Sequence, residues 1–292
     1  MTWLQLVSLL IKIPLSIWLA FGGAGLPALG AEGCAWATLI VNYAMVALAL
    51  SLMRSQRLYA PLALWQRMEP PDWPQLAQFA RLGIPAGLAI LVEVTSFTLM
   101  ALFVARQGTL ASASHQIAAN LAALCYMVPL SLAIATSARV SYWLGAGDEV
   151  TARRLVAMGW RLAAMGGLVL ACALFLSREG LARIYSGNPE VVAITASLLA
   201  WVAAYHVADA IQTFCIFVLR CYRITVAPLV IYCLLLWGGG LAGGYWLAYG
   251  TDSVLPAWLH PGTPAPFWAG SACALLVTAV VFSAVVRKAT NR

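Results

Sequence analysis

The sequence predicts an all-α fold, a polytopic membrane helix bundle with about eight transmembrane helices. Hydrophobic residues make up 63% of the 292 residues and charged residues 9%, whereas a soluble domain carries roughly 25% charged residues. The mean hydropathy is +0.87, and long apolar runs alternate with short polar connections. No core in water could bury this much apolar surface, so the lipid bilayer must be the solvent for most side chains.

Eight apolar runs are each long enough to cross a hydrocarbon core of roughly 30 Å as an α-helix that rises about 1.5 Å per residue. Turn signals separate them: Gly145-Ala-Gly147 ends the fourth run, and Gly187-Asn188-Pro189 precedes the sixth. We expect helices at Thr2–Phe21, Glu32–Met53, Leu82–Ala105, Ser114–Trp143, Val156–Leu176, Val191–Leu219, Thr225–Tyr249 and Phe267–Val286.

Basic residues are distributed unevenly between the two alternating sets of connections. Three of them, Arg106, Arg178 and Arg183, lie in one set, whereas thirteen lie in the set that includes the C-terminus. Because Lys and Arg are enriched in cytoplasmic loops, both chain ends are predicted to be cytoplasmic (N-in, C-in). The thirteen are Arg54, Arg57, Arg67, Arg81, Arg139, Arg153, Arg154, Arg161, Arg220, Arg223, Arg287, Lys288 and Arg292.

The longest internal connection, from Arg54 to Arg81, separates a two-helix piece from a six-helix piece. Its four prolines break any continuous helix, Pro61 among them. Asp72 with Gln75 three residues later matches a helix N-cap and capping box, so the third span is expected to start with an interfacial turn near Trp73. The predicted divisions are residues 1–58, residues 59–81 as a cytoplasmic linker, and residues 82–292.

The seventh span is rich in glycine, with five glycines between Gly238 and Gly244. Close packing against a neighbouring helix is the favoured interpretation, and a bending hinge is the alternative. Tryptophans near the ends of spans suit interfacial belts. These are Trp143, Trp160, Trp246, Trp258 and Trp268.

Two acidic residues, Glu93 and Asp209, lie deep within spans, where a charge is costly and usually functional. Glu93 lies twelve residues after Arg81, and Asp209 lies eleven residues before Arg220. Both carboxylates are therefore expected roughly 16–18 Å from the cytoplasmic side, because an α-helix rises about 1.5 Å per residue. Equal depth makes a shared site geometrically feasible.

Polar side chains accompany the two carboxylates at helical spacing. Tyr205 and Gln212 flank Asp209, Ser96 follows Glu93 on the same face, and the fourth span adds the polar pair Gln116 and Asn120. For the uncharged groups, interhelical hydrogen bonding worth on the order of 1 kcal/mol per contact is an equal alternative to a functional role. A purely structural hydrogen-bonding role is less expected for the carboxylates, because an uncharged serine could hold the helices together as well.

Two chemistries suit buried carboxylates of this kind. Apolar surroundings favour the protonated form of a carboxyl group, which can then carry a proton. Alternatively, ionised carboxylates and nearby hydroxyl or carbonyl oxygens can hold a hard monovalent cation. Either event neutralises the site and can shift the balance between inward- and outward-facing states.

Other function classes are disfavoured. The seven cysteines include no Cys-x-x-Cys pair and lie mostly inside apolar runs, so neither a disulfide framework nor a cysteine-based metal site is predicted. No His-Glu-x-x-His or Gly-x-Ser-x-Gly motif occurs, so we expect no enzyme and no organic cofactor. The net charge of +7 follows the membrane orientation pattern, so no nucleic-acid partner is expected.

Motifs along nearly the whole chain resemble, in order, those of NorM-type multidrug and toxic compound extrusion (MATE) transporters. Individually the motifs are weak, and together they are fairly specific. The similar segments are Gly33–Thr38, Gly83-Ile-Pro85 with Glu93, Ser114–Asn120, Met127–Ser131, Arg139–Arg153 with Gly145-Ala-Gly147, and Tyr205–Gln212.

The resemblance implies export of cationic organic compounds in exchange for Na⁺ or H⁺ through a multi-pass protein of the plasma membrane, the inner membrane in bacteria. Carried over to this sequence, Glu93, Asp209 and Tyr205 are the cation-coupling residues, with Na⁺ at Glu93 and Asp209 as one option. A substrate cavity is expected to include Ser96, Gln116, Asn120 and Gln212.

The family has twelve helices in two lobes, and this chain aligns from the fifth. Residues 1–58 then correspond to the last two helices of the N-terminal lobe and residues 82–292 to the C-terminal lobe. We expect a shortened or split polypeptide, with a separate chain that supplies the other helices. The alternatives are a non-transporting remnant or scaffold protein, or a related lipid or oligosaccharide flippase, which would have a more cationic cavity.

Overall fold

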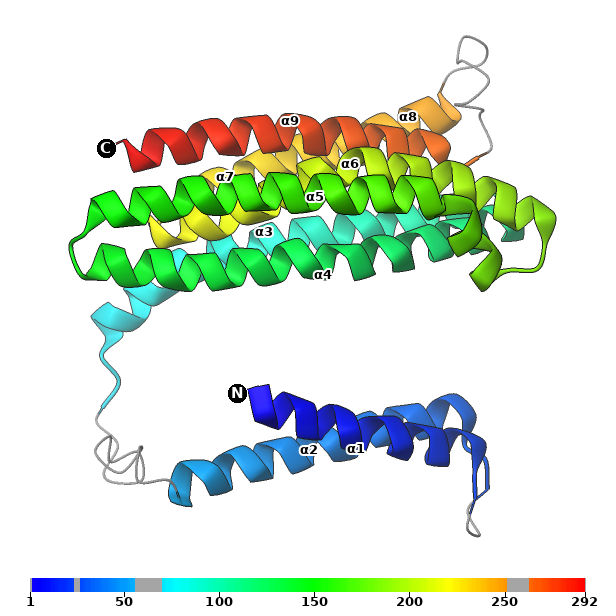
Figure 1. The fold of residues 1–292 in the computed structure, drawn as a ribbon, viewed down its shortest axis with the longest axis horizontal. Helices are drawn as coiled ribbons and strands as arrows, with labels where there is room; N and C mark the ends of the chain where they lie inside the picture. The colour runs from blue at the N-terminus through cyan, green and yellow to red at the C-terminus, as the bar shows by residue number, and fades with distance from the viewer. Residues whose placement is uncertain (1, 24–26, 56–69, 251–262, 292) are drawn as a thin grey trace. The chain divides into compact units, whose positions relative to one another are not determined.

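The computed structural model describes residues 2–23, 27–55, 70–250 and 263–291. Within these ranges, eight helical spans are long and apolar enough to cross a membrane. The chain forms two compact units, Met1–Pro71 and Asp72–Arg292 (Figure 1). Some residues used in the sequence predictions lie outside the described ranges: Arg57, Pro61, Arg67, Trp258 and Arg292.

The first unit contains α1 (Thr2–Phe21) and α2 (Gly30–Ser55), which pack against each other. Gly33 lies so close to α1 that a Cβ there would fall 2.3 Å from the carbonyl oxygen of Leu19. This contact requires glycine at position 33, because any side chain would push the two helices apart.

The second unit contains six spans. Five are unbroken helices, and the seventh span of the chain is divided into an α-helix, a π-helix and a second α-helix. In order, the elements are α3 (Trp73–Ala105), α4 (Thr109–Gly145), α5 (Glu149–Tyr185), α6 (Pro189–Cys221), α7 (Val226–Tyr232), the π-helix η2 (Cys233–Ala242), α8 (Gly243–Tyr249) and α9 (Ala265–Thr290).

The eight predicted spans are confirmed, and most helices extend a few residues beyond the predicted bounds. Helix α3 begins nine residues earlier than predicted and is one continuous helix from Trp73 onward, with Pro85 inside it. The turn expected near Trp73 is the first turn of this helix. The predicted N-cap is confirmed, since Asp72 Oδ1 accepts a hydrogen bond of 3.2 Å from the backbone N–H of Gln75.

Helix α6 is the central helix of the second unit and packs against α4, α5 and α9. Its side chains are small or apolar in nearly every direction, which is the pattern of a helix buried on all sides. Several polar groups on α6 are therefore buried too, and they include Asp209 and Gln212.

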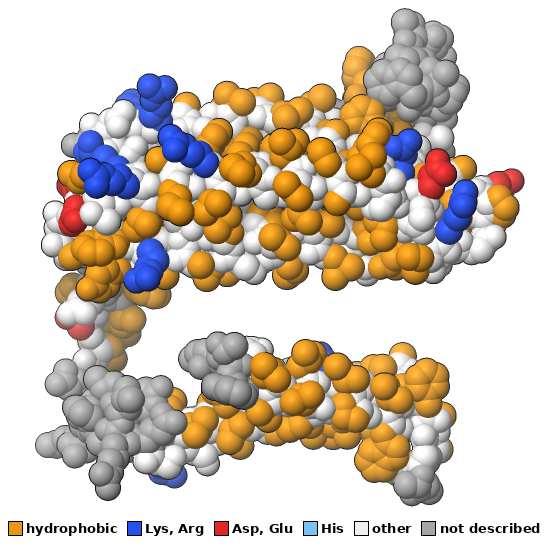
Figure 2. Space-filling model, viewed as in Figure 1, with side chains coloured by type: hydrophobic (Ala, Val, Ile, Leu, Met, Phe, Trp, Pro, Cys, Tyr) orange, Lys and Arg blue, Asp and Glu red, His pale blue; other side chains and the backbone are white. Residues whose placement is uncertain are grey.

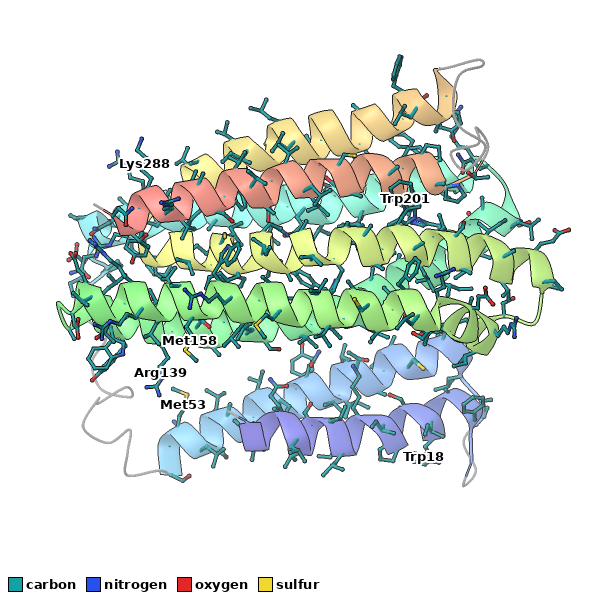
Figure 3. All side chains as sticks on the ribbon, turned by 45° about the horizontal axis from the view of Figure 1, so that its top comes forward. Trp18, Met53, Arg139, Met158, Trp201 and Lys288 are labelled. Carbon is teal, nitrogen blue, oxygen red and sulfur yellow. The ribbon has the colours of Figure 1, made fainter. Side chains whose placement is uncertain are left out.

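Charged and apolar side chains are segregated along the second unit. On the face drawn in Figure 2, apolar side chains cover the middle and most Lys and Arg side chains lie toward the end that carries the C-terminus. Arg139 and Lys288 both lie toward that end in Figure 3. Such a distribution suits a bundle with a lipid-facing middle and a basic interfacial end.

Close packing between the seventh span and α9 explains part of the glycine-rich sequence. A Cβ at Gly270 on α9 would lie 2.9 Å from the carbonyl oxygen of Gly240, and a Cβ at Gly244 would lie 3.0 Å from the Cα of Phe267. The packing interpretation is thus confirmed at these positions. By contrast, a Cβ at Gly243 would meet nothing within 4 Å.

We predict that Gly270→Ala lowers the free energy of unfolding by roughly 1–3 kcal/mol, because overpacking forces backbone shifts. Gly243→Ala is the matched control on the facing span and is expected to be neutral or slightly stabilising. Unfolding of the purified chain in mixed micelles would measure both. Equal effects of the two substitutions would contradict the close-packing interpretation.

Asp148 caps the N-terminus of α5, in the connection after Gly147. Its Oδ1 accepts a hydrogen bond of 2.9 Å from the backbone N–H of Thr151, and its Oδ2 accepts one of 2.6 Å from the Thr151 hydroxyl. These hydrogen bonds hold the pKa of Asp148 below its usual range. The cap therefore stabilises the folded chain above the ordinary pKa of aspartate and is lost as the pH falls through the lower, folded value.

We predict that Asp148→Ala lowers the melting temperature at pH 7, and that the difference from the original chain shrinks below about pH 4. Asp148→Asn keeps an acceptor for the cap but does not titrate, so its deficit should be smaller at pH 7. Thermal melts across this pH range would test both variants. A deficit for Asp148→Ala that is independent of pH would contradict the capping role.

Candidate functional site

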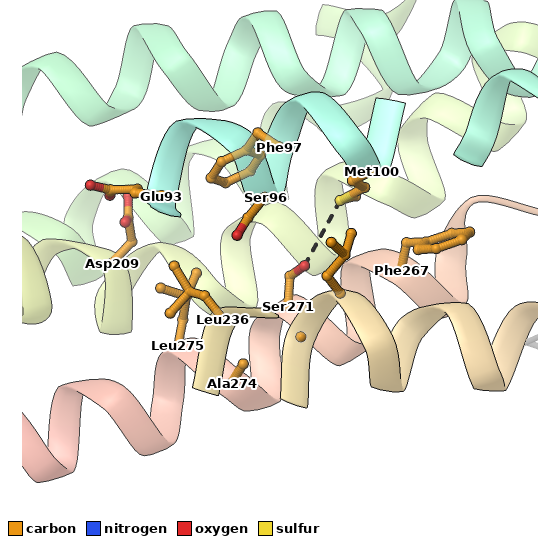
Figure 4. Close-up of a pocket in the computed structure, with 12 residues that line it drawn as sticks. Glu93, Ser96, Phe97, Met100, Asp209, Leu236, Phe267, Ser271, Ala274 and Leu275 are labelled. Carbon is orange, nitrogen blue, oxygen red and sulfur yellow. Dashed lines mark hydrogen bonds between the residues drawn. The ribbon is translucent and has the colours of Figure 1, made fainter. Parts of the chain in front are cut away.

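Glu93 on α3 and Asp209 on α6 meet at one cavity inside the second unit. Figure 4 shows the two carboxyl groups pointing toward each other. They reach the same level because α3 and α6 place them at matching distances from one end of the bundle, as the rise of an α-helix requires. Their charges interact directly.

The cavity is small and mostly apolar. Its volume of about 20 Å³ is enough for a water molecule or a bare monovalent cation, but far below the several hundred Å³ of a drug-sized pocket. Four elements surround it, namely α3, α6, the π-helix η2 and α9. The lining residues are Glu93, Ser96, Phe97, Met100, Asp209, Leu236, Gly240, Leu241, Phe267, Ser271, Ala274 and Leu275.

Gln212 connects Asp209 to the seventh span. Its side-chain Nε2 donates to Asp209 Oδ1 at 3.1 Å and to the Thr213 hydroxyl at 3.3 Å. Its Oε1 accepts a hydrogen bond from the hydroxyl of Tyr232. Gln212 and Tyr232 are both fully buried, so each satisfies a polar group that would otherwise be unpaired in an apolar medium.

Neither carboxylate forms a salt bridge with a described basic residue, although the charge of Arg220 on α6 acts on Glu93 through space. Within the described part of the second unit, the salt bridges are Glu149–Arg153 and Glu179–Arg183, both on the exposed surface of α5. Asp209 is only 7% exposed. A buried and a partly buried carboxylate without a salt bridge to a described basic residue make a strong site for a positive charge or a proton.

Ser96 and Ser271 bring hydroxyl groups to the same cavity. The Ser96 hydroxyl donates to the carbonyl oxygen of Val92 at 2.8 Å, and the Ser271 hydroxyl lies 3.8 Å from the sulfur of Met100. A hydroxyl oxygen that donates its hydrogen keeps two lone pairs. Both oxygens are thus available as additional ligands beside the carboxylates.

Tyr205 is buried one helical turn before Asp209, but it does not line the cavity. Its ring stacks on Trp268 of α9 with ring centroids 5.9 Å apart, and His115 packs against the same indole at 5.5 Å. Trp268 is fully buried, so the prediction that it belongs to an interfacial belt is wrong. It lies near the end of its helix, yet it packs into the core between α4 and α6.

Gln116 and Asn120 lie on α4, away from the carboxylate cavity, and both side chains are exposed on the second unit. Asn120 Oδ1 accepts a hydrogen bond of 3.3 Å from the Tyr185 hydroxyl. The two residues could therefore meet a substrate without touching the cavity. Of the four residues predicted for the substrate cavity, Ser96 and Gln212 therefore lie with the carboxylates, whereas Gln116 and Asn120 lie apart from them.

The sequence argument missed three groups at the site. Tyr232 binds Gln212, Tyr126 on α4 interacts with Thr213 and with both carboxylates, and Trp237 binds the backbone beside Glu93. Tyrosine and tryptophan are ordinary in membrane helices, so their identity gave no signal. Tyr126 could have been found by its depth, since it lies thirteen residues before Arg139, close to the eleven residues that separate Asp209 from Arg220.

Comparisons with known proteins identify the family. A family model described as MatE matches residues 85–246, which is more than half of the chain. The chain belongs to the MATE family. The family is one of transporters, and with eight apolar spans this MATE chain is a multi-pass protein of the plasma membrane.

The MATE chain is similar to two groups of bacterial proteins. It is 37% identical over 280 residues to a probable multidrug resistance protein NorM of Aromatoleum aromaticum, covering 96% of this chain and 60% of that protein. It is 35% identical over 285 residues to the multidrug resistance protein MdtK of Yersinia pseudotuberculosis, with the same coverage. The chain spans about 60% of the length of these relatives.

Solved structures share the fold. The eukaryotic MATE transporter AtDTX14 matches this chain with a TM-score of 0.81 at 22% identity. The match covers 99% of this chain and 64% of the AtDTX14 chain. The Vibrio cholerae MATE transporter VcmN in its bent form has a TM-score of 0.76 at 19% identity, with 99% and 61% coverage. At these identities the similarity establishes the fold alone.

We predict that Gln212→Leu lowers the free energy of unfolding by roughly 1–3 kcal/mol, because it leaves the Tyr232 hydroxyl unpaired and removes a donor from Asp209. Gln116→Leu is the matched control, since the same change there affects an exposed amide and should have little effect. Unfolding in mixed micelles would compare the two. An equal loss at both positions would show that the buried network contributes nothing specific.

Proposed function

We propose that the chain takes part in secondary active multidrug efflux, in which cationic organic compounds leave the cell in exchange for Na⁺ or H⁺. The observation that carries this proposal is the pair Glu93 and Asp209, which line one small cavity without a salt bridge to a described basic residue. The NorM and MdtK relatives are named as multidrug resistance proteins.

The coupling chemistry follows from charge and size. The carboxylates repel each other in an apolar medium, so a proton or a monovalent cation that enters the cavity lowers the energy of the occupied state. Hard cations take oxygen ligands, and oxygens of Glu93, Asp209, Ser96 and Ser271 are at hand. The cavity has room for one such ion and not for an organic substrate.

Exchange requires that binding of the ion changes the affinity for the substrate, and that binding of the substrate changes the affinity for the ion. Occupation of the carboxylate pair favours one arrangement of α3 and α6, and release of the ion favours another. A cationic substrate that prefers the second arrangement is then exported at the expense of the ion gradient, because coupling between two sites is reciprocal. We propose Gln116 and Asn120, exposed on α4, as part of the substrate surface, with Tyr205 supporting α6 beside Asp209.

The division into lobes is part of the same proposal. Residues 1–58 act as the last two helices of an N-terminal lobe, residues 59–81 as the linker and residues 82–292 as the C-terminal lobe. Alternating access in transporters built of two halves needs both halves. We therefore propose that helices equivalent to the rest of a full-length relative complete the pathway, and a separate chain is one way to supply them.

Efflux of a fluorescent organic cation from cells that lack other pumps tests this proposal. The chain would be expressed alone and together with the first four helices of a NorM relative. Glu93→Gln and Asp209→Asn should reduce efflux to the vector level, whereas the surface controls Glu179→Gln and Asp72→Asn should not. Immunoblots of membrane fractions would verify equal expression.

Two results would contradict the proposal. Absence of efflux in both arrangements would exclude transport by this lobe, and efflux that survives both carboxylate substitutions would exclude the site. Repeating the assay with the Na⁺ gradient or the pH gradient collapsed identifies the coupling ion, because only the relevant gradient drives export.

A further inference from the structure

The seventh span contacts both carboxylate-bearing helices next to their carboxylates. The Tyr232 hydroxyl at the end of α7 donates to Gln212 Oε1, and Gln212 Nε2 donates to Asp209. Five residues later, Trp237 Nε1 in η2 donates to the carbonyl oxygen of Val92 at 3.2 Å, directly before Glu93 on α3. One short stretch of chain therefore binds α6 at one carboxylate and α3 at the other.

The π-helical geometry of η2 makes both contacts compatible. In a π-helix the hydrogen bonds run from residue i to i+5 and each turn takes more residues than in an α-helix, so side chains five apart point in more similar directions. In an α-helix, positions five apart differ by about 140° around the axis. If this segment were α-helical, Tyr232 and Trp237 would face different directions, and one of the two hydrogen bonds would be lost.

The same π-helix also forms one wall of the cavity, through Leu236, Gly240 and Leu241. The Val92 carbonyl that accepts from Trp237 also accepts from the Ser96 hydroxyl at 2.8 Å, and Ser96 lines the cavity. A change in η2 would therefore alter the wall, the position of α3 and the position of Gln212 together. π-helical turns occur frequently at functional sites.

We propose that Tyr232 and Trp237 are positioning residues for the coupling site, through which the π-helix holds α3 and α6 at the separation where Glu93 and Asp209 share one proton or monovalent cation. The inference rests on the proposed function of that pair. Neither residue touches the ion in this scheme. Each acts through a neighbour, Tyr232 through Gln212 and Trp237 through the backbone at Val92.

Ion-dependent thermal stability of the purified full chain in detergent tests this inference without requiring transport. A ligand that binds the folded state raises the melting temperature by an amount that depends on its concentration relative to its Kd. Melts would be recorded against Na⁺, with N-methylglucamine as the replacement cation, and against pH. The titratable or charged groups that interact with the carboxylates are Tyr126 on α4, Tyr232 on α7 and Arg220 on α6.

Trp237→Phe and Tyr232→Phe each remove one hydrogen bond and keep the ring. We expect each to raise the half-effective ion concentration roughly two- to tenfold, the range that one net hydrogen bond explains, and the double substitution to raise it further. Trp246→Phe and Tyr142→Phe, which alter exposed rings, should leave it unchanged. Glu93→Gln and Asp209→Asn should abolish the ion response.

The outcomes separate the two proposals. If the original chain responds to neither ion, or if the carboxylate substitutions leave the response intact, the coupling site is wrong and this inference falls with it. If the response depends on the carboxylates but Trp237→Phe and Tyr232→Phe leave the half-effective concentration unchanged, only the positioning role is wrong. A lower melting temperature at every ion concentration, with an unchanged half-effective concentration, would show a purely structural role.

Discussion

The repulsion between Glu93 and Asp209 inside an apolar bundle is the interaction on which the rest of the second unit depends. Carboxylates placed in lipid-like surroundings without a basic partner destabilise the fold unless a proton or a cation joins them. Gln212 and the rigid packing of α6 hold Asp209 in place despite this repulsion. In the proposed function, the occupied state of this site is its state of lowest energy.

The proposed ion site and the exposed polar side chains of α4 are separate in space, an arrangement that suits the proposed exchange. A cavity of about 20 Å³ has room only for a small ion, whereas Gln116 and Asn120 lie on an exposed surface. Communication between them must pass through α6, which packs against α4, α5 and α9. A central helix that carries one of the carboxylates is well placed to move both surfaces together.

Much of the fold could be predicted from the sequence, because span length and loop charge follow directly from the bilayer. The shared level of Glu93 and Asp209 followed from the fixed rise of an α-helix, and the cap at Asp72 followed from its side-chain chemistry. The π-helix could not be predicted, since its i→i+5 bonds depend on packing against α3, α6 and α9. For the same reason the contacts of Tyr232, Trp237 and the buried Trp268 could not be predicted from the sequence.

The most direct test of the central claim is the number of ions bound to the purified chain. Equilibrium binding of radioactive Na⁺, together with proton release measured in weakly buffered solution, would give this number. If Glu93 and Asp209 form one shared site, one Na⁺ or one proton binds per chain, and either Glu93→Gln or Asp209→Asn alone removes it. Two independent sites, or one site that survives the loss of either carboxylate, would contradict the claim.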